Sequence, residues 1–424
     1  MTPLLRHGSA ALIALAVVGL PSGGPATAQE ISTDQAILVA QRLIQRRPQS
    51  AAGYARLGDA YIQKSRQTGD LSYLTLAEQA LRRALDLAPG SAAAARHLAY
   101  VFSSRHEFKE AAAQARRAIE LDPGDGHARG VLGDALLELG EYEDAARAFD
   151  AMSSRDTSLY SLSRRSGLTS LHGDPEGAAA ELRRAIETGR TTGEPRESLA
   201  WAQWQLGAEH FAVGRLDLAE ARYRDALRTF PSYYRALGGL AQVRAGQQRY
   251  DEAIELYRQA LGVIPLPEYA AALGDLHTKL GQPHEARKQY ALVEYIGRLN
   301  AINRVVYNRE LAYFYADHDL KPDEALALAR AELEVRRDIY GYDVLAWALY
   351  KSGQTEEALA AMREALRLGT RDARLFFHAG MIHRDLGHRD QAREFLTRAL
   401  STNPYFHVLQ AAVAQRALAE LADR

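Results

Sequence analysis

A short run of acidic and imidazole side chains offers the most direct chemistry in the sequence. Asp317, His318 and Asp319 are consecutive, and His378 and His383 follow further along the chain. Carboxylate and imidazole groups bind divalent cations, so this group would suit a metal-dependent or hydrolytic enzyme. The spacing matches no established metal motif, because neither His-x3-His nor His-Glu-x2-His occurs. Acidic and histidine side chains at helix ends are often simply exposed to solvent and bind no metal. An enzyme is therefore the alternative hypothesis and not the leading one.

The other usual catalytic patterns are missing from the chain. It has no G-x4-G-K-[ST] or G-x-G-x-x-G loop to bind phosphate and no G-x-S-x-G nucleophile turn. It contains no cysteine, which excludes disulfides, thiolate metal ligands and a cysteine nucleophile. We therefore predict a protein that is not an enzyme and that uses no cofactor.

The composition is that of a folded protein with a balanced charge. The 424 residues are 47% hydrophobic and 25% charged, with 52 basic against 53 acidic side chains. No strong overall field exists to attract nucleic acid or an anionic membrane. Nucleic acid is accordingly not an expected partner.

The N-terminus has the features of a secretory signal peptide. Arg6 precedes an apolar run over residues 10–20, and residues 26–28 read Ala-Thr-Ala. We expect residues 1–28 to be removed, which places the protein in a bacterial periplasm or cell envelope with no membrane span after cleavage. The run is shorter than the roughly 18 residues of a spanning helix, although an uncleaved anchor is the alternative.

Alanine recurs through the chain at a nearly constant spacing. Successive copies lie 33 to 41 residues apart, and most lie 33 or 34 apart. The ten positions are Ala77, Ala111, Ala145, Ala178, Ala219, Ala253, Ala286, Ala325, Ala358 and Ala392. A period near 34 is typical of a repeat built from two helices and a turn.

The residues around these alanines carry a specific resemblance. The first unit contains Tyr54, Leu57, Gly58 and Tyr61, followed by Ala77, Leu81 and a closing Pro89; Leu206-Gly207 with Tyr223 and Gly380 with Leu396 repeat parts of the pattern. On these residues the chain resembles the tetratricopeptide-repeat proteins. Thr157 replaces one closing proline, and Arg165-Ser166 replaces one Leu-Gly pair.

The resemblance implies an all-α fold, a right-handed superhelical solenoid of about ten helix pairs. We assign the repeat array to residues 51–404, with capping helices at 29–50 and 405–424. Each helix pair leaves one face exposed until its neighbour covers it, so the ends of such an array need polar caps. Gly58 and Ala77 are small because the two helices of a pair approach closely there.

The resemblance also implies a concave surface lined by first-helix residues, which binds another protein or a peptide segment. Projected onto this sequence, the predicted groove mixes aromatic with charged side chains, as interface centres often do. Its residues are Tyr100, Trp201, Trp204, Phe211, Arg309, Tyr313, Asp317, Tyr340, Asp343, Trp347, Tyr350, Phe377 and Arg384. The alternative is that these side chains pack between successive repeats.

The leading hypothesis is therefore a protein-protein interaction scaffold of the bacterial cell envelope. Its competitor is a metal-dependent or hydrolytic enzyme that would use Asp317, His318 and His378. The sequence leaves both the identity of the partner and the oligomeric state open.

Overall fold

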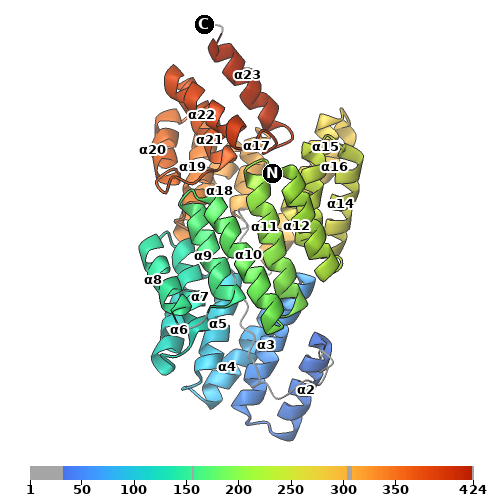
Figure 1. The fold of residues 1–424 in the computed structure, drawn as a ribbon, viewed down its shortest axis with the longest axis vertical. Helices are drawn as coiled ribbons and strands as arrows, with labels where there is room; N and C mark the ends of the chain where they lie inside the picture. Colours follow the sequence, from blue (N-terminus) through green and yellow to red (C-terminus); the bar gives the residue numbers. More distant parts are fainter. Residues whose placement is uncertain (1–31, 155–156, 303–307, 423–424) are drawn as a thin grey trace. The chain divides into compact units, whose positions relative to one another are not determined.

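The computed structural model describes residues 32–154, 157–302 and 308–422, and within those ranges the chain is helical with no strand (Figure 1). Twenty-two helices are present in this part of the chain. One helix, α2 (Thr33–Arg46), comes before the pairs and another, α23 (Gln410–Ala422), comes after them. The ten pairs are α3 (Ala51–Thr68) with α4 (Ser72–Leu87), α5 (Ala92–Ser104) with α6 (Phe108–Leu121), α7 (Gly126–Glu138) with α8 (Tyr142–Ser153), α9 (Leu159–Leu171) with α10 (Pro175–Thr192), α11 (Arg196–Ala212) with α12 (Leu216–Thr229), α13 (Tyr234–Gly246) with α14 (Tyr250–Val263), α15 (Pro267–Lys279) with α16 (Pro283–Ile302), α17 (Asn308–Asp317) with α18 (Pro322–Val335), α19 (Ile339–Lys351) with α20 (Thr355–Ala365), and α21 (Ala373–Asp385) with α22 (Arg389–Thr402).

The recurring alanines all lie on the second helix of a pair. Nine of the ten have no exposed surface, and Ala286 is 3% exposed. A side chain larger than a methyl group at these positions would separate the two helices of the pair. The structure thus confirms the all-α fold of ten helix pairs, with one further helix at each end. The predicted signal peptide, residues 1–28, lies outside the described residues, and none of the described helices is long and apolar enough to cross a membrane.

The chain divides into two compact units, each described by itself below. The N-terminal unit contains described residues 32–137 and 142–161. In it α2 packs on the first pair through Ala40, which contacts Leu57 and Ala80. This contact covers apolar surface that the first pair would otherwise leave exposed. The C-terminal unit contains residues 138–141 and the described residues from 162 onward.

Glycine permits close helix contacts in the C-terminal unit. A Cβ added to Gly207 in α11 would lie 2.6 Å from the ring of Tyr223, and one added to Gly239 in α13 would lie 2.5 Å from the same ring. Tyr223, in α12, has no exposed surface. The ring of Tyr223 therefore lies against the backbones of two first helices, where only glycine leaves room for it.

We expect Gly207→Ala to destabilise the protein by about 1–3 kcal/mol, because the added methyl group overpacks this contact. Gly262→Ala is the matched control, since a Cβ at Gly262 in α14 meets nothing within 4 Å. The control should be neutral or stabilising by up to about 1 kcal/mol, the helix preference of alanine over glycine. Urea unfolding of both variants measures the difference, and equal midpoints would contradict the packing described.

The C-terminal unit also brings distant helix connections together. The Thr370 hydroxyl donates to the carbonyl oxygen of Leu171, and Arg371 lies 3.3 Å from the carboxylate of Glu176. Gly173 lies beside them with a φ of +84°, and a Cβ there would be 2.6 Å from the carbonyl oxygen of Gly369. Only glycine tolerates both that φ and that approach. The connection within the fourth pair thus contacts the one between the ninth and tenth pairs.

Candidate functional site

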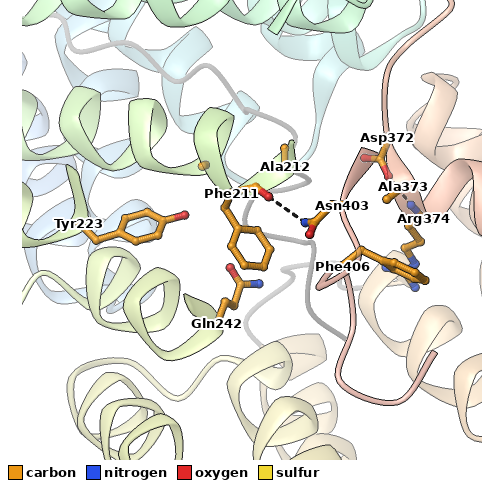
Figure 2. A pocket seen from close by; sticks show the side chains of 10 residues that line it. Phe211, Ala212, Tyr223, Gln242, Asp372, Ala373, Arg374, Asn403 and Phe406 are labelled. Atoms are coloured by element: carbon orange, nitrogen blue, oxygen red, sulfur yellow. Dashed lines mark hydrogen bonds between the residues drawn. The ribbon is translucent and has the colours of Figure 1, made fainter. Parts of the chain in front are cut away.

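Two adjoining pockets lie between first helices of the C-terminal unit. One is bordered by α11, α13 and the start of α21, and the other extends from α11 and α13 to α15. Phe211, Gln242 and Phe406 line both pockets. Figure 2 shows these three side chains around the first pocket, with Arg374 from α21 beyond Phe406.

The pockets flank residues 403–410, the connection from α22 to α23, which we call the docked segment. Four of its side chains are buried: Asn403 is 2% exposed, Phe406 2%, His407 3% and Gln410 6%. Tyr405, between them, is 41% exposed. The docked segment therefore faces the first helices with one set of side chains and solvent with another.

In three polar contacts between the docked segment and the first helices, the segment supplies the donor. The Asn403 amide donates to the main-chain carbonyl of Phe211 at 2.8 Å, as Figure 2 shows. Gln410 donates its amide to the carboxylate of Asp317 at 2.6 Å. In these contacts the first helices supply the acceptors.

His407 makes the third of these contacts, and its proton position follows from its neighbours. Nδ1 accepts from the main-chain amides of Leu409 and Gln410, at 3.1 and 3.2 Å. The proton must then be on Nε2, which lies 3.3 Å from the carboxylate of Asp275. Burial lowers the pKa of His407 to about 4, which agrees with a neutral ring.

Two carboxylates, Asp317 and Asp275, are the acceptors at the centre of this surface. Besides Gln410, Asp317 accepts from Trp347 Nε1 at 2.8 Å and from Arg374 at 3.0 Å. His318 Nε2 lies 2.6 Å from Asp275, and its Nδ1 lies 2.7 Å from the carbonyl of Phe314. Burial would lower the pKa of His318, but Asp275 raises it above its ordinary value. Both ring nitrogens face acceptors, so His318 is the cationic partner of Asp275.

The three residues of the enzyme hypothesis do not share one site. Asp317 pairs with Arg374, His318 with Asp275, and His378 with Asp343, at 2.8 Å. No group of three acidic, histidine or cysteine side chains suited to a metal ion occurs in the described part of the chain. The geometry gives these histidines structural partners and offers no specific support for a metal centre.

A second buried network connects α17, α19 and α21. Asp343 accepts from the Tyr313 hydroxyl at 2.6 Å and from His378. The ring of His378 stacks on Trp347 at 4.1 Å, nearly parallel, and Arg374 lies 3.6 Å above the ring of Tyr313. These contacts hold consecutive first helices in register by polar and aromatic groups together.

Arg309 is the most enclosed cation of this region. Its side chain has no exposed surface and contacts both carboxylate oxygens of Asp338, at 2.6 and 3.1 Å, and Glu332 at 2.9 Å. Burial alone would lower the pKa of Arg309, but Asp338 and Glu332 hold it well above its ordinary value. The guanidinium thus joins α17 to the end of α18 and to the N-cap of α19.

Comparison with known proteins identifies the repeat. Sequence models described as tetratricopeptide repeat match residues 102–161, 205–272 and 344–407. The chain is a tetratricopeptide-repeat protein. No curated protein sequence matches it.

Several solved structures are similar to this chain. The human IFIT1 dimer with PPP-AAAA has a TM-score of 0.50 and 14% identity, over 80% of this chain and 77% of that chain. Yeast Tom70 has a TM-score of 0.35 and 13% identity, over 92% and 93%. A tetratricopeptide repeat protein from Parabacteroides merdae has 0.35 and 18%, over 63% and 99%. At such identities only the fold is transferable, and it comes from the IFIT1 comparison.

The predicted groove residues of this tetratricopeptide-repeat protein are largely enclosed by the chain itself. Tyr350, Arg384 and Asp317 are partly accessible as residues. The remaining ten are buried: Tyr100, Trp201, Trp204, Phe211, Arg309, Tyr313, Tyr340, Asp343, Trp347 and Phe377. This burial is what the packing alternative describes, and partner binding through these residues remains a prediction. Of the thirteen, Phe211, Asp317 and Phe377 contact the docked segment.

Sequence reasoning did not find the docked segment or Asp275. Residues 403 and 404 were assigned to the repeat array and residues 405–410 to the C-terminal capping helix, whereas α23 begins at Gln410. The signals were Pro404 after Asn403, which breaks a helix, and polar residues at positions 403, 407 and 410 beside Phe406. They predict a turn with one buried side, but not the helices that this side contacts.

Proposed function

We propose that this tetratricopeptide-repeat protein is a non-catalytic scaffold of the bacterial cell envelope that binds a segment of another protein. The binding surface would be formed by the first helices α11, α15, α17, α19 and α21 of the C-terminal unit. One observation carries the proposal: these helices already hold a non-helical piece of polypeptide, the docked segment, through a carbonyl and two carboxylates. Short segments of a partner that bind in a preformed groove are a common mode of peptide recognition.

The cellular location rests on the sequence. Residues 1–28 have the charged start, apolar run and small-residue site of a secretory signal. The near-neutral charge favours a protein or peptide partner over nucleic acid. No specific observation favours the enzyme alternative, because Asp317, His318 and His378 are each paired separately.

Capture from an envelope extract of the native bacterium tests this function. Tyr350 and Arg384 are the groove residues to alter, because both retain partial exposure and their loss should leave the core intact. We expect the full chain to retain a partner that Tyr350→Ala/Arg384→Ala loses by at least tenfold at an unchanged melting temperature. Arg393→Ala, an exposed arginine on α22, is the control. A partner retained equally by all three proteins, or found only in cytoplasmic fractions, would contradict the proposal.

A further inference from the structure

We propose that the docked segment, residues 403–410, is a built-in competitor for the partner-binding surface. It would occupy the position of a partner segment that carries an aromatic anchor and N–H donors, and such a segment would displace it. The inference rests on the proposed function, and it adds the chemistry of the partner and a means of control.

The chemistry of the partner follows from the groups that the docked segment contacts. The surface offers the carbonyl of Phe211 and the carboxylates of Asp275 and Asp317, all acceptors. It also offers the ring of Phe377, whose centroid is 5.5 Å from that of Phe406. A fitting segment therefore presents amide, imidazole or cationic donors on both sides of an aromatic residue. An acidic segment would bring carboxylate acceptors, and no donors, to these three acceptors.

The docked segment can leave without dismantling the repeat that precedes it. The tenth pair is closed by its own contact, in which Gly380 of α21 lies against Leu396 of α22. The docked segment is joined to the first helices by four side chains, and its Pro404 and Tyr405 remain exposed. The pockets on each side of Phe406 show that it does not fill the surface on which it lies.

Competition by a tethered segment has a predictable size. A segment attached by a short flexible linker acts at an effective concentration on the order of millimolar. A free segment that binds the empty surface with a Kd of about 10 µM would then bind the intact chain about a hundredfold more weakly. The full chain should therefore bind such a segment poorly until its own segment is released.

The test uses a fluorescent peptide that copies residues 401–412 and the full-length protein. In the release variant, Asn403→Asp, Phe406→Ala and Gln410→Ala remove the contacts to Phe211, Phe377 and Asp317. We expect the peptide to bind this variant at least tenfold more tightly than the unaltered chain, measured by fluorescence anisotropy. A peptide that itself carries Phe406→Ala and Gln410→Ala should bind neither protein.

Arg393→Ala is the control protein, because it changes an exposed side chain of α22 outside the docked segment. It should behave as the unaltered chain does. Equal binding to the unaltered chain and the release variant would overturn the proposal. So would a release variant that keeps its helical circular dichroism and melting temperature but binds no peptide.

Hydrogen exchange on the unaltered chain keeps the proposal testable if the release variant does not fold. The amides of Leu409 and Gln410, which donate to His407, should show protection at least tenfold below that of amides inside α21. Equal protection would mean that the segment is a permanent part of the core and would overturn the proposal. The peptide test needs no natural partner, so its failure is distinct from a failed envelope capture.

Discussion

Arg309→Met is expected to lower the free energy of unfolding by about 3–5 kcal/mol, the usual cost of removing one partner from a buried ion pair. The Arg309 side chain has no exposed surface, and those of Asp338 and Glu332 are 7% and 3% exposed. Glu332 keeps a second cation, Arg336, at 3.5 Å. Asp338 would keep the main-chain amide of Gly341, at 2.7 Å, but would lose both bonds from Arg309. The loss of both of these charge-assisted bonds accounts for most of the expected destabilisation.

The control is Arg393→Met, which removes an ion pair of similar length from the surface. Arg393 and Asp390 lie 2.5 Å apart, with side chains 56% and 86% exposed. Exposed pairs contribute at most about 1 kcal/mol, so this variant should melt like the unaltered chain. The double variant Arg309→Met/Asp338→Asn should recover part of the stability that Arg309→Met loses, because it removes the buried carboxylate that Arg309 had bound. Equal losses for Arg309→Met and Arg393→Met in urea unfolding would refute the assignment.

Trp347→Ala is expected to destabilise the protein by a similar amount, about 3–5 kcal/mol. Trp347 is 2% exposed, stacks on His378 and donates to Asp317. Its loss would leave a cavity and remove one of the donors that Asp317 accepts. Trp347→Phe keeps most of the ring but not the donor, so it should cost less, about 1–3 kcal/mol. Chemical denaturation of the two variants separates the packing contribution from that of the hydrogen bond.

Tyr295→Ala provides the control for this series, because Tyr295 on α16 is 53% exposed. Its substitution should change stability by less than about 0.5 kcal/mol.

The same variants also distinguish a role of Trp347 in partner recognition from a role in core packing. Loss of partner binding at an unchanged melting temperature would place Trp347 in a recognition surface. A melting temperature that falls as expected would place it in the core, and the more accessible Tyr350 would then be the better probe of binding.

The amino-acid sequence by itself determined the repeat and its local packing. Ala77 and its nine counterparts could be found from spacing alone, because two helices that cross closely tolerate only a small side chain at the crossing. Pro89 and Gly58 also have local explanations. Pro89 follows the end of a helix, and Gly58 lies where the second helix of its pair approaches closely. Such positions depend on the nearest helix only, and the nearest helix is adjacent in the sequence.

The tertiary structure decided which first-helix side chains are accessible. Trp347 and Tyr350 are three residues apart on one helix and were assigned to one groove, yet Trp347 is buried and Tyr350 is partly accessible. The periodicity of a helix gives the direction of a side chain, but not what lies opposite it. In the C-terminal unit that depends on the accumulated rotation of several pairs.

The docked segment shows the same limit most clearly. Asn403 contacts the carbonyl of Phe211, which is 192 residues earlier in the chain, and His407 contacts Asp275. No repeat spacing relates these positions, because each contact joins a connection to a helix several pairs away. The repeat pattern therefore predicted the helices. Only the folded unit brought the donors of residues 403–410 to the acceptors of α11 and α15.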